Sequence, residues 1–335
     1  MITILKQHKN TFAAIMLGCT LSLSAQDPRF TQVLANPLQL NPAMMGMNSD
    51  LKLIMQYRSQ WSGIEKGFST ASLSVLYPLY IKGGKEKLDI GFNALNNVAG
   101  AYNKLDFSLA LGYNLHITEA SYISLSISGG YIQKSINTNN LSFDQQYSLG
   151  SYSSTNPTNE ANLNKKVGYA DVGFGSIWYY NKSKAEGAKL NAYLGASVFH
   201  LNKPNESLTA GNAQLPMRYS FQGGIKILGE GKIDFTPNVI YNSQAGNENL
   251  AIGMLMDYRF NEKSKLVLGA WYRKKDAVAF SLGCDLKAFS FAYSYDVVSS
   301  RIQNYVSGLN AHEITLMLKF NQADKKGIKV NQSLF

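Results

Sequence analysis

The fold is decided by a stretch near the end of the chain, which reads His312-Glu313-Ile314-Thr315-Leu316-Met317-Leu318-Lys319-Phe320. Successive side chains of a β-strand point to opposite faces, so every second residue from Ile314 to Phe320 shares one apolar face. The opposite face carries mostly polar residues. This pattern, with an aromatic residue at its end, is typical of the closing strand of an outer-membrane β-barrel, which directs apolar residues to lipid and polar ones to the lumen.

The same alternation recurs through most of the chain. It is clearest from Leu105 to Ile117, and no helix has a period of two. About fourteen such strands occur, an even number as in bacterial barrels, and many exceed the roughly five or six residues of ordinary strands. They begin near Leu51, Ser69, Lys87, Lys104, Tyr122, Val167, Lys189, Leu215, Lys232, Asn249, Ser264, Asp276, Lys287 and Asn310. The sequence predicts an all-β transmembrane outer-membrane β-barrel of about 14 antiparallel strands over residues 50–320.

The connections between the expected strands alternate in length. If Leu51 begins a strand that rises from the periplasm, the even-numbered connections are short. The odd-numbered ones are expected to be longer, except for a two-residue turn near Lys275; they span residues 61–68, 97–103, 136–166, 202–214, 244–248 and 298–309. This alternation predicts long connections outside the cell and both ends of the barrel sequence on the periplasmic side.

The start of the chain is typical of an exported protein. Lys6 and Lys9 precede an apolar run that closes at Ser24-Ala25, which predicts a signal peptide over residues 1–25. A competing interpretation takes Cys19 as a lipidation site. After cleavage Cys284 is the only cysteine, so no intrachain disulfide is expected. Export and the barrel pattern predict the outer membrane of a Gram-negative bacterium, with residues 321–335 as a periplasmic tail.

Residues 26–49 form an irregular N-terminal segment. Asn36-Pro37 and Asn41-Pro42 are turn signals, which exclude a regular strand. The segment is nevertheless too apolar for a free tail. It is expected to act as a plug in the barrel lumen or as a docking element at the periplasmic rim.

Motifs of catalysis and cofactor binding are missing from the sequence. His312-Glu313 opens like a zinc-protease motif, but Leu316 replaces the second histidine. His116 and His200 are isolated near strand ends, lack acidic or cysteine companions at ligand spacing, and are interpreted as structural. Gly173-x-Gly175 lacks the third glycine of a phosphate-binding loop and is interpreted as relieving crowding on the lumen face. We therefore expect no cofactor, no metal and no enzymatic activity. The formal charge of +10 comes from lysines spread over turns, which does not favour nucleic acid as a partner.

The expected connection 136–166 is rich in Ser and Asn and contains Leu141-Ser142-Phe143-Asp144-Gln145-Gln146. Loops of this length without structure of their own are uncommon unless they are functional or disordered. A recognition loop outside the cell is the favoured interpretation. A merely solvated loop is the alternative.

Several groups of residues resemble motifs of the PorP/SprF family of type IX secretion system membrane proteins. They are Gln26 to Gln32 with Asn36-Pro37-Leu38, Asn41-Pro42-Ala43 and Gly46; Tyr57-Arg58-Ser59-Gln60-Trp61; Leu141 to Gln146; and Tyr293-x-Tyr295-Asp296 with Gly308 and His312 to Leu316. The resemblance covers the whole mature chain, and the order and spacing of these motifs match the family. Met44-Met45 departs from the family pattern, which more usually has an aromatic and a small residue there.

The resemblance implies an outer-membrane component of the type IX secretion or gliding apparatus. It implies a non-enzymatic barrel that binds, anchors or helps export a secreted surface protein or adhesin, with type IX secretion components and outer-membrane lipid as its other partners. Residues 26–46 and Tyr57 to Trp61 are expected to dock periplasmic or intraluminal elements, and 136–166 to contact the partner. The predicted partner-binding residues are Asp27, Pro28, Phe30, Asn36, Asn41, Pro42, Tyr57, Arg58, Trp61, Phe143, Asp144 and Gln145.

Three other interpretations remain open at the level of the sequence. A soluble β-sandwich or propeller also has alternating strands, but no blade-length repeat occurs. An outer-membrane transport channel for small hydrophobic solutes is suggested by small residues on expected lumen positions, such as Ser108, Ala110, Gly173 and Ser281. A hydrolase would need a serine or carboxylate constellation that the motifs do not supply.

Overall fold

The computed structural model describes residues 27–61, 67–81, 86–137, 141, 143–148, 151–153, 155–157, 166–182, 187–209, 211–261, 264–299 and 310–320. The predicted signal peptide and the predicted tail 321–335 lie outside these residues. No helix within the described ranges is long and apolar enough to cross a membrane.

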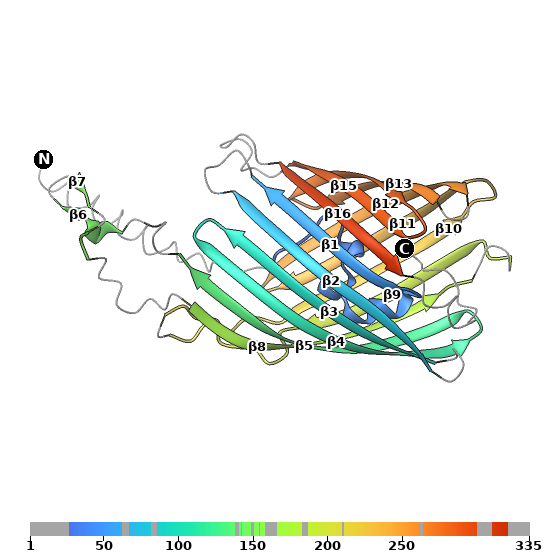
Figure 1. Ribbon diagram of the computed structural model, residues 1–335, viewed down its shortest axis with the longest axis horizontal. Coiled ribbons are helices and arrows are strands. Elements are labelled where there is room, and N and C mark those ends of the chain that lie inside the picture. Colours follow the sequence, from blue (N-terminus) through green and yellow to red (C-terminus); the bar gives the residue numbers. More distant parts are fainter. Residues whose placement is uncertain are drawn as a thin grey trace, which may run out of the picture.

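The strands close into a single antiparallel barrel (Figure 1). Each strand pairs with its neighbours along the chain, and β1 closes the barrel by pairing with β16 from Leu51↔Phe320 to Gln60↔Ala311. Its strands are β1 (Leu51–Gln60), β2 (Phe68–Ile81), β3 (Glu86–Ala99), β4 (Tyr102–Thr118), β5 (Ser121–Ile136), β8 (Lys166–Tyr180), β9 (Leu190–Phe199), β10 (Arg218–Leu228), β11 (Ile233–Gln244), β12 (Asn247–Asn261), β13 (Ser264–Arg273), β14 (Ala277–Asp285), β15 (Phe289–Val298) and β16 (Ala311–Phe320). The prediction of a 14-stranded antiparallel barrel is confirmed.

Alternation along the strands separates an apolar outside from a polar inside. On β4, Leu109 and Leu111 are 59% and 57% exposed, whereas the intervening Ala110 is buried. Large exposed side chains of this kind occur on strands all around the barrel, including Ile127 on β5 and Leu194 on β9. A continuous apolar outer surface matches contact with lipid, because polar groups on a lipid-facing surface are costly.

Two connections differ from the lengths expected. The chain between β3 and β4 is only Gly100 and Ala101, and the chain between β11 and β12 is only Ala245 and Gly246. The expectation of longer loops at 97–103 and 244–248 is therefore wrong. Ala245 and Gly246 both have positive φ, 52° and 77°, which is the backbone of a two-residue turn that lets the flanking strands pair to their ends.

The N-terminal segment lies inside the barrel (Figure 1). It contains three short helical pieces, η1 (Val33–Ala35), α2 (Pro37–Leu40) and η2 (Pro42–Met47). Asp27 contacts Lys104 and His200, which lie at the end of the barrel that carries the connection 137–165. At the opposite end the segment continues into β1. The described segment thus runs along the lumen from one end to the other.

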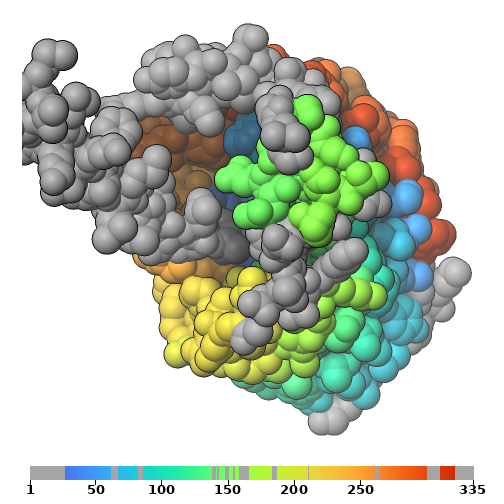
Figure 2. Space-filling view, turned by 90° about the vertical axis from the view of Figure 1, so that its left-hand side faces the viewer, coloured from blue at the N-terminus to red at the C-terminus, as the bar shows by residue number. Residues whose placement is uncertain are grey.

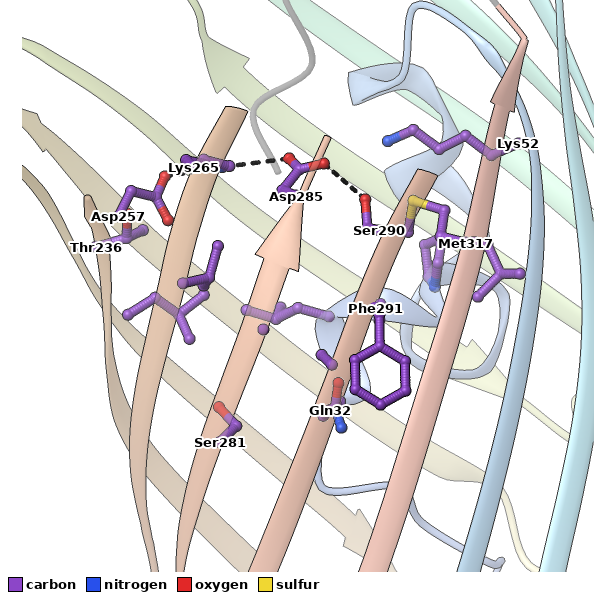
Figure 3. Close-up of a pocket in the computed structure, with 18 of the residues that line it drawn as sticks. Gln32, Lys52, Thr236, Asp257, Lys265, Ser281, Asp285, Ser290, Phe291 and Met317 are labelled. Carbon is purple, nitrogen blue, oxygen red and sulfur yellow. Dashed lines mark hydrogen bonds and ion pairs between the residues drawn. The ribbon is translucent and has the colours of Figure 1, made fainter. Parts of the chain in front are cut away.

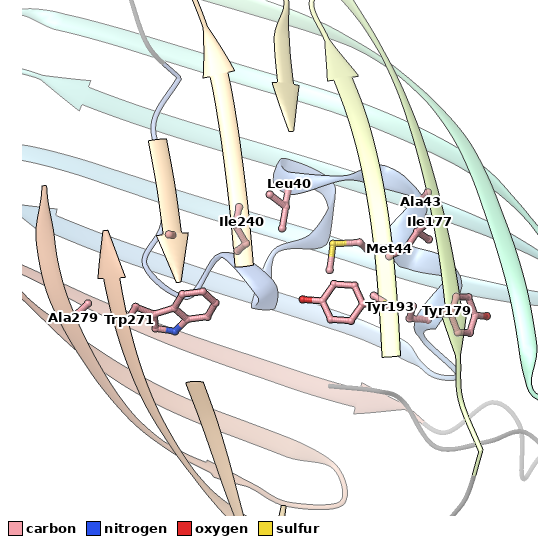
Figure 4. Close-up of a cluster of buried hydrophobic side chains, with 11 residues drawn as sticks. Leu40, Ala43, Met44, Ile177, Tyr179, Tyr193, Ile240, Trp271 and Ala279 are labelled. Atoms are coloured by element: carbon pink, nitrogen blue, oxygen red, sulfur yellow. The ribbon is translucent and has the colours of Figure 1, made fainter. Parts of the chain in front are cut away.

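The apolar core of the molecule lies between this segment and the barrel wall (Figure 4). Leu40, Ala43, Met44 and Met47 pack against Ile177, Tyr179, Tyr193, Ile240 and Trp271. On the other side of the segment, Leu38 and Met45 pack with Ile54, Leu76 and Ala110. Burying apolar side chains of this size stabilises the packed segment by roughly 1.5–3 kcal/mol each.

Candidate functional site

The occupied lumen is the candidate functional site, and Asn41 shows how closely the segment fits the wall. The Asn41 amide donates to the backbone carbonyl oxygens of Ser176 on β8 and Ala196 on β9, at 3.0 and 3.2 Å. Its oxygen accepts from the Ala43 backbone N–H at 2.9 Å and caps η2. A Cβ on Gly175 would collide with the Asn41 side-chain oxygen. That glycine provides space on the lumen face, as the sequence suggested, and the space is filled by the N-terminal segment.

A first group of charged and polar residues holds the segment where the barrel closes. We call this group the seam cluster; it consists of Thr31, Arg58, Arg273, Asp296 and Glu313. It joins the segment to β1, β13, β15 and β16, so residues more than 200 positions apart in the sequence meet here.

The guanidinium groups of two arginines pair directly with carboxylates in the seam cluster. Arg58 contacts Asp296 at 2.6 Å and Glu313 at 3.2 Å, and Arg273 contacts Asp296 at 2.7 Å. The Thr31 backbone N–H donates to Glu313 at 2.6 Å, and its hydroxyl donates to Asp296 at 2.8 Å. Arg58, Asp296 and Glu313 are at most 2% exposed. Pairing with opposite charges is what makes buried charges tolerable.

A second group holds the start of the described segment. This rim cluster consists of Asp27, Lys104, Asp171, His200 and Arg218. Lys104 and His200 contact the Asp27 carboxylate at 2.6 and 2.8 Å, and Arg218 contacts it at 3.3 Å. The other ring nitrogen of His200 lies 2.8 Å from Asp171.

Charge pairing sets the protonation of the rim cluster. Burial raises the pKa of Asp27, but Lys104, Arg218 and His200 outweigh burial and hold that pKa well below its ordinary 3.8. Burial lowers the pKa of His200, whereas Asp27 and Asp171 raise it further, so the net pKa lies above 6.5. Both shifts favour an ionised Asp27 beside a protonated His200.

The connection between β5 and β8 reaches beyond the strand ends (Figure 1). It contains η5 (Asp144–Gln146) and a small hairpin of β6 (Tyr147–Ser148) and β7 (Ser151–Tyr152). Gln146 is buried and accepts from the Phe143 backbone N–H at 3.0 Å. Tyr147 and Tyr152 lie 5.3 Å apart at their ring centres and are about half exposed. Figure 2 views this end and shows the green loop residues beside a hollow in the end of the barrel.

Sequence comparison connects this architecture to a family. Residues 22–318 match the family model described as Type IX secretion system membrane protein PorP/SprF. The chain belongs to the PorP/SprF family. It is accordingly an outer-membrane barrel of the type IX secretion system, and family membership implies association with secretion components. The family description names no catalytic activity. No curated protein matches the sequence.

Solved barrels of distant sequence resemble this PorP/SprF protein in outline. The toluene transporter TbuX of Ralstonia pickettii is 9% identical with a TM-score of 0.49, the comparison covering 85% of this chain and 93% of that one. The Pseudomonas aeruginosa FadL homologue is 10% identical with a TM-score of 0.46, covering 84% and 92%. The toluene transporter TodX of P. putida is 9% identical with a TM-score of 0.46, covering 84% and 93%. Likeness at this level carries no argument about function.

The structure brings together only some of the predicted partner-binding residues of this PorP/SprF protein. Those of the segment lie in the lumen: Asp27 in the rim cluster, Pro28 half-buried beside it, Phe30 and Pro42 buried, Asn41 on the wall, and Asn36 bonded to Ser72 at 2.9 Å. Arg58 joins the same lumen through the seam cluster. These contacts place the segment inside the lumen, one of the two positions that the sequence left open.

The other predicted residues lie elsewhere. Tyr57 points outward from β1 and is 52% exposed, while Trp61 follows β1 with a positive φ of 57° and packs its ring 4.7 Å from Phe68. Phe143, Asp144 and Gln145 lie in the connection beyond the strand ends. The predicted residues therefore form no single surface.

Sequence reasoning missed the roles of His200 and Thr31. His200 was interpreted as an isolated structural histidine, yet it bridges Asp27 and Asp171. Thr31 carries no motif that singles it out. Arg218, Arg273 and Asp296 lie in strands of the barrel, and no motif in the sequence indicates which charges they pair with. The useful signal was the placement of charges at every second strand position, which marks the lumen face.

Within the described residues, no group of three His, Cys, Asp or Glu side chains is arranged to hold a metal.

Proposed function

We propose that this PorP/SprF protein binds a secreted surface protein or adhesin at the cell surface and anchors it there or helps its export. The contact surface is the connection 137–165, including Phe143, Asp144 and Gln145. The observation that carries the proposal is the contrast between a lumen that residues 27–49 occupy and the small hairpin of Tyr147–Ser148 and Ser151–Tyr152, which lies beyond the strand ends. A partner protein finds exposed aromatic side chains there, at Tyr147 and Tyr152. Aromatic residues of this kind are enriched among protein-binding hot spots.

The docking role proposed for the segment follows from its position. Residues 27–46 contact the wall through the rim cluster, the seam cluster and Asn41. In this proposal the segment keeps the lumen closed and fixes the strand ends that carry the connection 137–165. Arg58 serves that role from β1. Tyr57 and Trp61 remain candidates for contact with neighbouring membrane components, because they lie on the outer face and at a strand end.

Replacing residues 141–157 by a short Gly-Ser linker tests the contact surface. The variant is expected to insert as a folded barrel and to lose the co-purifying secreted protein. A sharper variant carries Tyr147→Ser and Tyr152→Ser, with Tyr131→Ser as its matched control, since Tyr131 is equally exposed but lies on the barrel wall. Mass spectrometry of proteins that co-purify with a tagged copy from gently solubilised outer membranes measures the result. Undiminished recovery of the partner with the linker variant would refute the assignment.

A channel for small hydrophobic solutes is the second candidate function. The observation that favours it is an apolar cavity inside the lumen, beside the N-terminal segment. Solute uptake by vesicles that contain the purified barrel would support it, especially if deletion of residues 27–49 increased the rate. A lumen sealed to ions and to solutes in the intact protein would argue against it.

A further inference from the structure

A cavity of about 180 Å³ lies between the N-terminal segment and the wall formed by β10 to β16 and β1 (Figure 3). Its lining is largely apolar and includes Leu34, Met44, Leu255, Val267, Trp271 and Met317. An apolar cavity of about 150 Å³ in another protein accepts benzene, so this one has room for a ring or a stretch of alkyl chain. The cavity exists because η2 packs on the strands of the opposite wall, β2 to β5 and β8.

One end of the cavity is lined by lysines. Lys52, Lys226, Lys265 and Lys319, which we call the lysine ring, come from β1, β10, β13 and β16. They lie at the end of the barrel where β1 begins and β16 ends. In Figure 3 Lys52 and Lys265 lie toward the upper edge, whereas Gln32 and Ser281 lie toward the lower edge.

Three lysines of the ring share two carboxylates. Asp257 accepts from Lys226 at 3.0 Å and from Lys265 at 2.8 Å, and Asp285 pairs with Lys319. Lys52 donates to the Asn48 side chain at 2.7 Å, with Asp50 as a further acidic neighbour. Asp234 is a further acidic neighbour of Lys226 and pairs with Arg259 at 3.0 Å. Among the described residues, four lysines therefore lie beside an apolar space with two carboxylates at ion-pair distance. An anion placed among them gains from several ammonium groups at once, because low dielectric surroundings strengthen each contact.

We propose that this cavity binds a single-chain anionic amphiphile, with its carboxylate on the lysine ring and its alkyl chain against Trp271 and Met44. The cavity matches both parts of such a ligand. Its apolar lining favours an alkyl chain, and the lysine ring at one end fixes the orientation of that chain. A neutral chain leaves the lysines without an added anion, and a small inorganic anion leaves the apolar walls unfilled.

The test measures binding to the full-length barrel held in amphipol, which avoids detergent in the cavity. Decanoate, decanol and decyltrimethylammonium are titrated by calorimetry. Fluorescence is followed in a Trp61→Phe/Trp178→Phe background, in which Trp271 is the remaining tryptophan. Decanoate is expected to bind saturably and to change Trp271 emission, with decanol weaker and the cation weakest. Equal affinity for decanoate and decanol would overturn the proposal.

Variants separate the two halves of the site. Lys52→Gln/Lys319→Gln is expected to weaken decanoate binding by about tenfold or more, as when a buried charge loses its partners, and to leave decanol unchanged. Lys134→Gln is the matched control, because Lys134 also faces the lumen and pairs with a carboxylate, Glu206, but lies outside this cavity. Ala292→Phe fills the apolar part and is expected to abolish binding of both chains. Melting temperatures of all variants show whether the barrel stays folded.

Two outcomes oppose the proposal directly. Unchanged decanoate affinity in the Lys52→Gln/Lys319→Gln variant would remove the lysine ring from the site. Tight binding of a short apolar peptide through its C-terminal carboxylate, with decanoate unable to compete, would assign the cavity to a protein end instead. Neither outcome bears on the connection 137–165, so this proposal and the proposed anchoring function fail independently.

Discussion

The seam cluster and the rim cluster hold the same segment by different chemistry. The seam cluster uses two arginines, Arg58 and Arg273, whose guanidinium groups stay charged at any physiological pH. The rim cluster uses one lysine, one arginine and His200, and a histidine changes charge close to neutral pH. One attachment is therefore permanent and the other responds to pH.

The two clusters also differ in their position in the barrel. The seam cluster spans the strands that close the barrel, so the segment contributes to closure itself. The rim cluster holds Asp27 at the end of the lumen near the connection 137–165. We infer that loss of the seam cluster affects the whole barrel, whereas loss of the rim cluster affects mainly the start of the segment.

Arg58→Met is expected to have the largest effect. It leaves Asp296 and Glu313 buried with fewer positive partners, and breaking a buried pair costs about 3–5 kcal/mol of unfolding free energy. Urea unfolding of the barrel in lipid vesicles measures this cost. Arg58→Lys, which keeps the charge but loses the planar fork, is the matched variant and should cost distinctly less. Equal stability of wild type and Arg58→Met would contradict a role of the seam cluster in closure.

Asp27→Asn is expected to cost less, about 1.5–3 kcal/mol, as for hydrogen bonds to a charged group. Hydrogen exchange of residues 27–32 should increase, while exchange of the barrel strands stays as in the wild type. Asp276→Asn is the control, because Asp276 also pairs with an arginine, Arg273 at 2.8 Å, but is half exposed and expected to contribute at most about 1 kcal/mol. Global loosening of the strands in Asp27→Asn would erase the distinction between the two clusters.

A pH titration of the melting temperature probes His200. Its raised pKa means that its ion pair with Asp27 contributes fully below pH 6.5, the ordinary pKa of histidine, and is lost as the pH rises through the raised pKa. The lowered pKa of Asp27 means that the same contact is lost in acid only as the pH falls below 3.8 through the lowered pKa. The stability difference between wild type and His200→Gln should therefore shrink toward alkaline pH. In an Asp27→Asn background that difference should keep only the part of its pH dependence that comes from Asp171, which contacts the other ring nitrogen of His200.

Removing residues 141–157 is expected to have the smallest effect on stability, within about 0.5 kcal/mol, as for changes away from a packed core. The connection contacts neither cluster among the described residues. Urea unfolding of the linker variant measures the difference. A large loss of stability would show that the connection supports the lumen as well as the surface.

The sequence predicted the barrel because its decisive signal is local. Alternation along Leu105 to Ile117 marks the two faces of β4 without reference to any other strand, and lipid contact preserves that alternation in each strand. The expected loops at 97–103 and 244–248 were wrong because a positive φ at Gly100 or Gly246 turns the chain within two residues. A turn of this kind is hard to distinguish from a longer loop by composition.

The contacts of the lumen lay beyond sequence reasoning. Arg58 and Asp296 are 238 residues apart, and their pairing depends on strand register and on the path of the segment between them. Many lumen positions carry charges of suitable sign, so alternation alone does not select partners. His200 was misjudged for the same reason, since Asp27 approaches it from a segment without regular structure.

The path of residues 27–49 constrains the order of assembly. A chain that runs lengthwise inside a closed wall has to be in place before the last pair of strands joins, or else thread through one open end afterwards. Because Thr31 bonds to β15 and β16 and also contacts β1, the first route lets the segment act as a template on which the ends of the sheet meet. Once β1 and β16 have paired, the segment can leave the lumen only along the barrel axis. The rate of this movement, more than the strength of the segment's contacts with the wall, then governs its release.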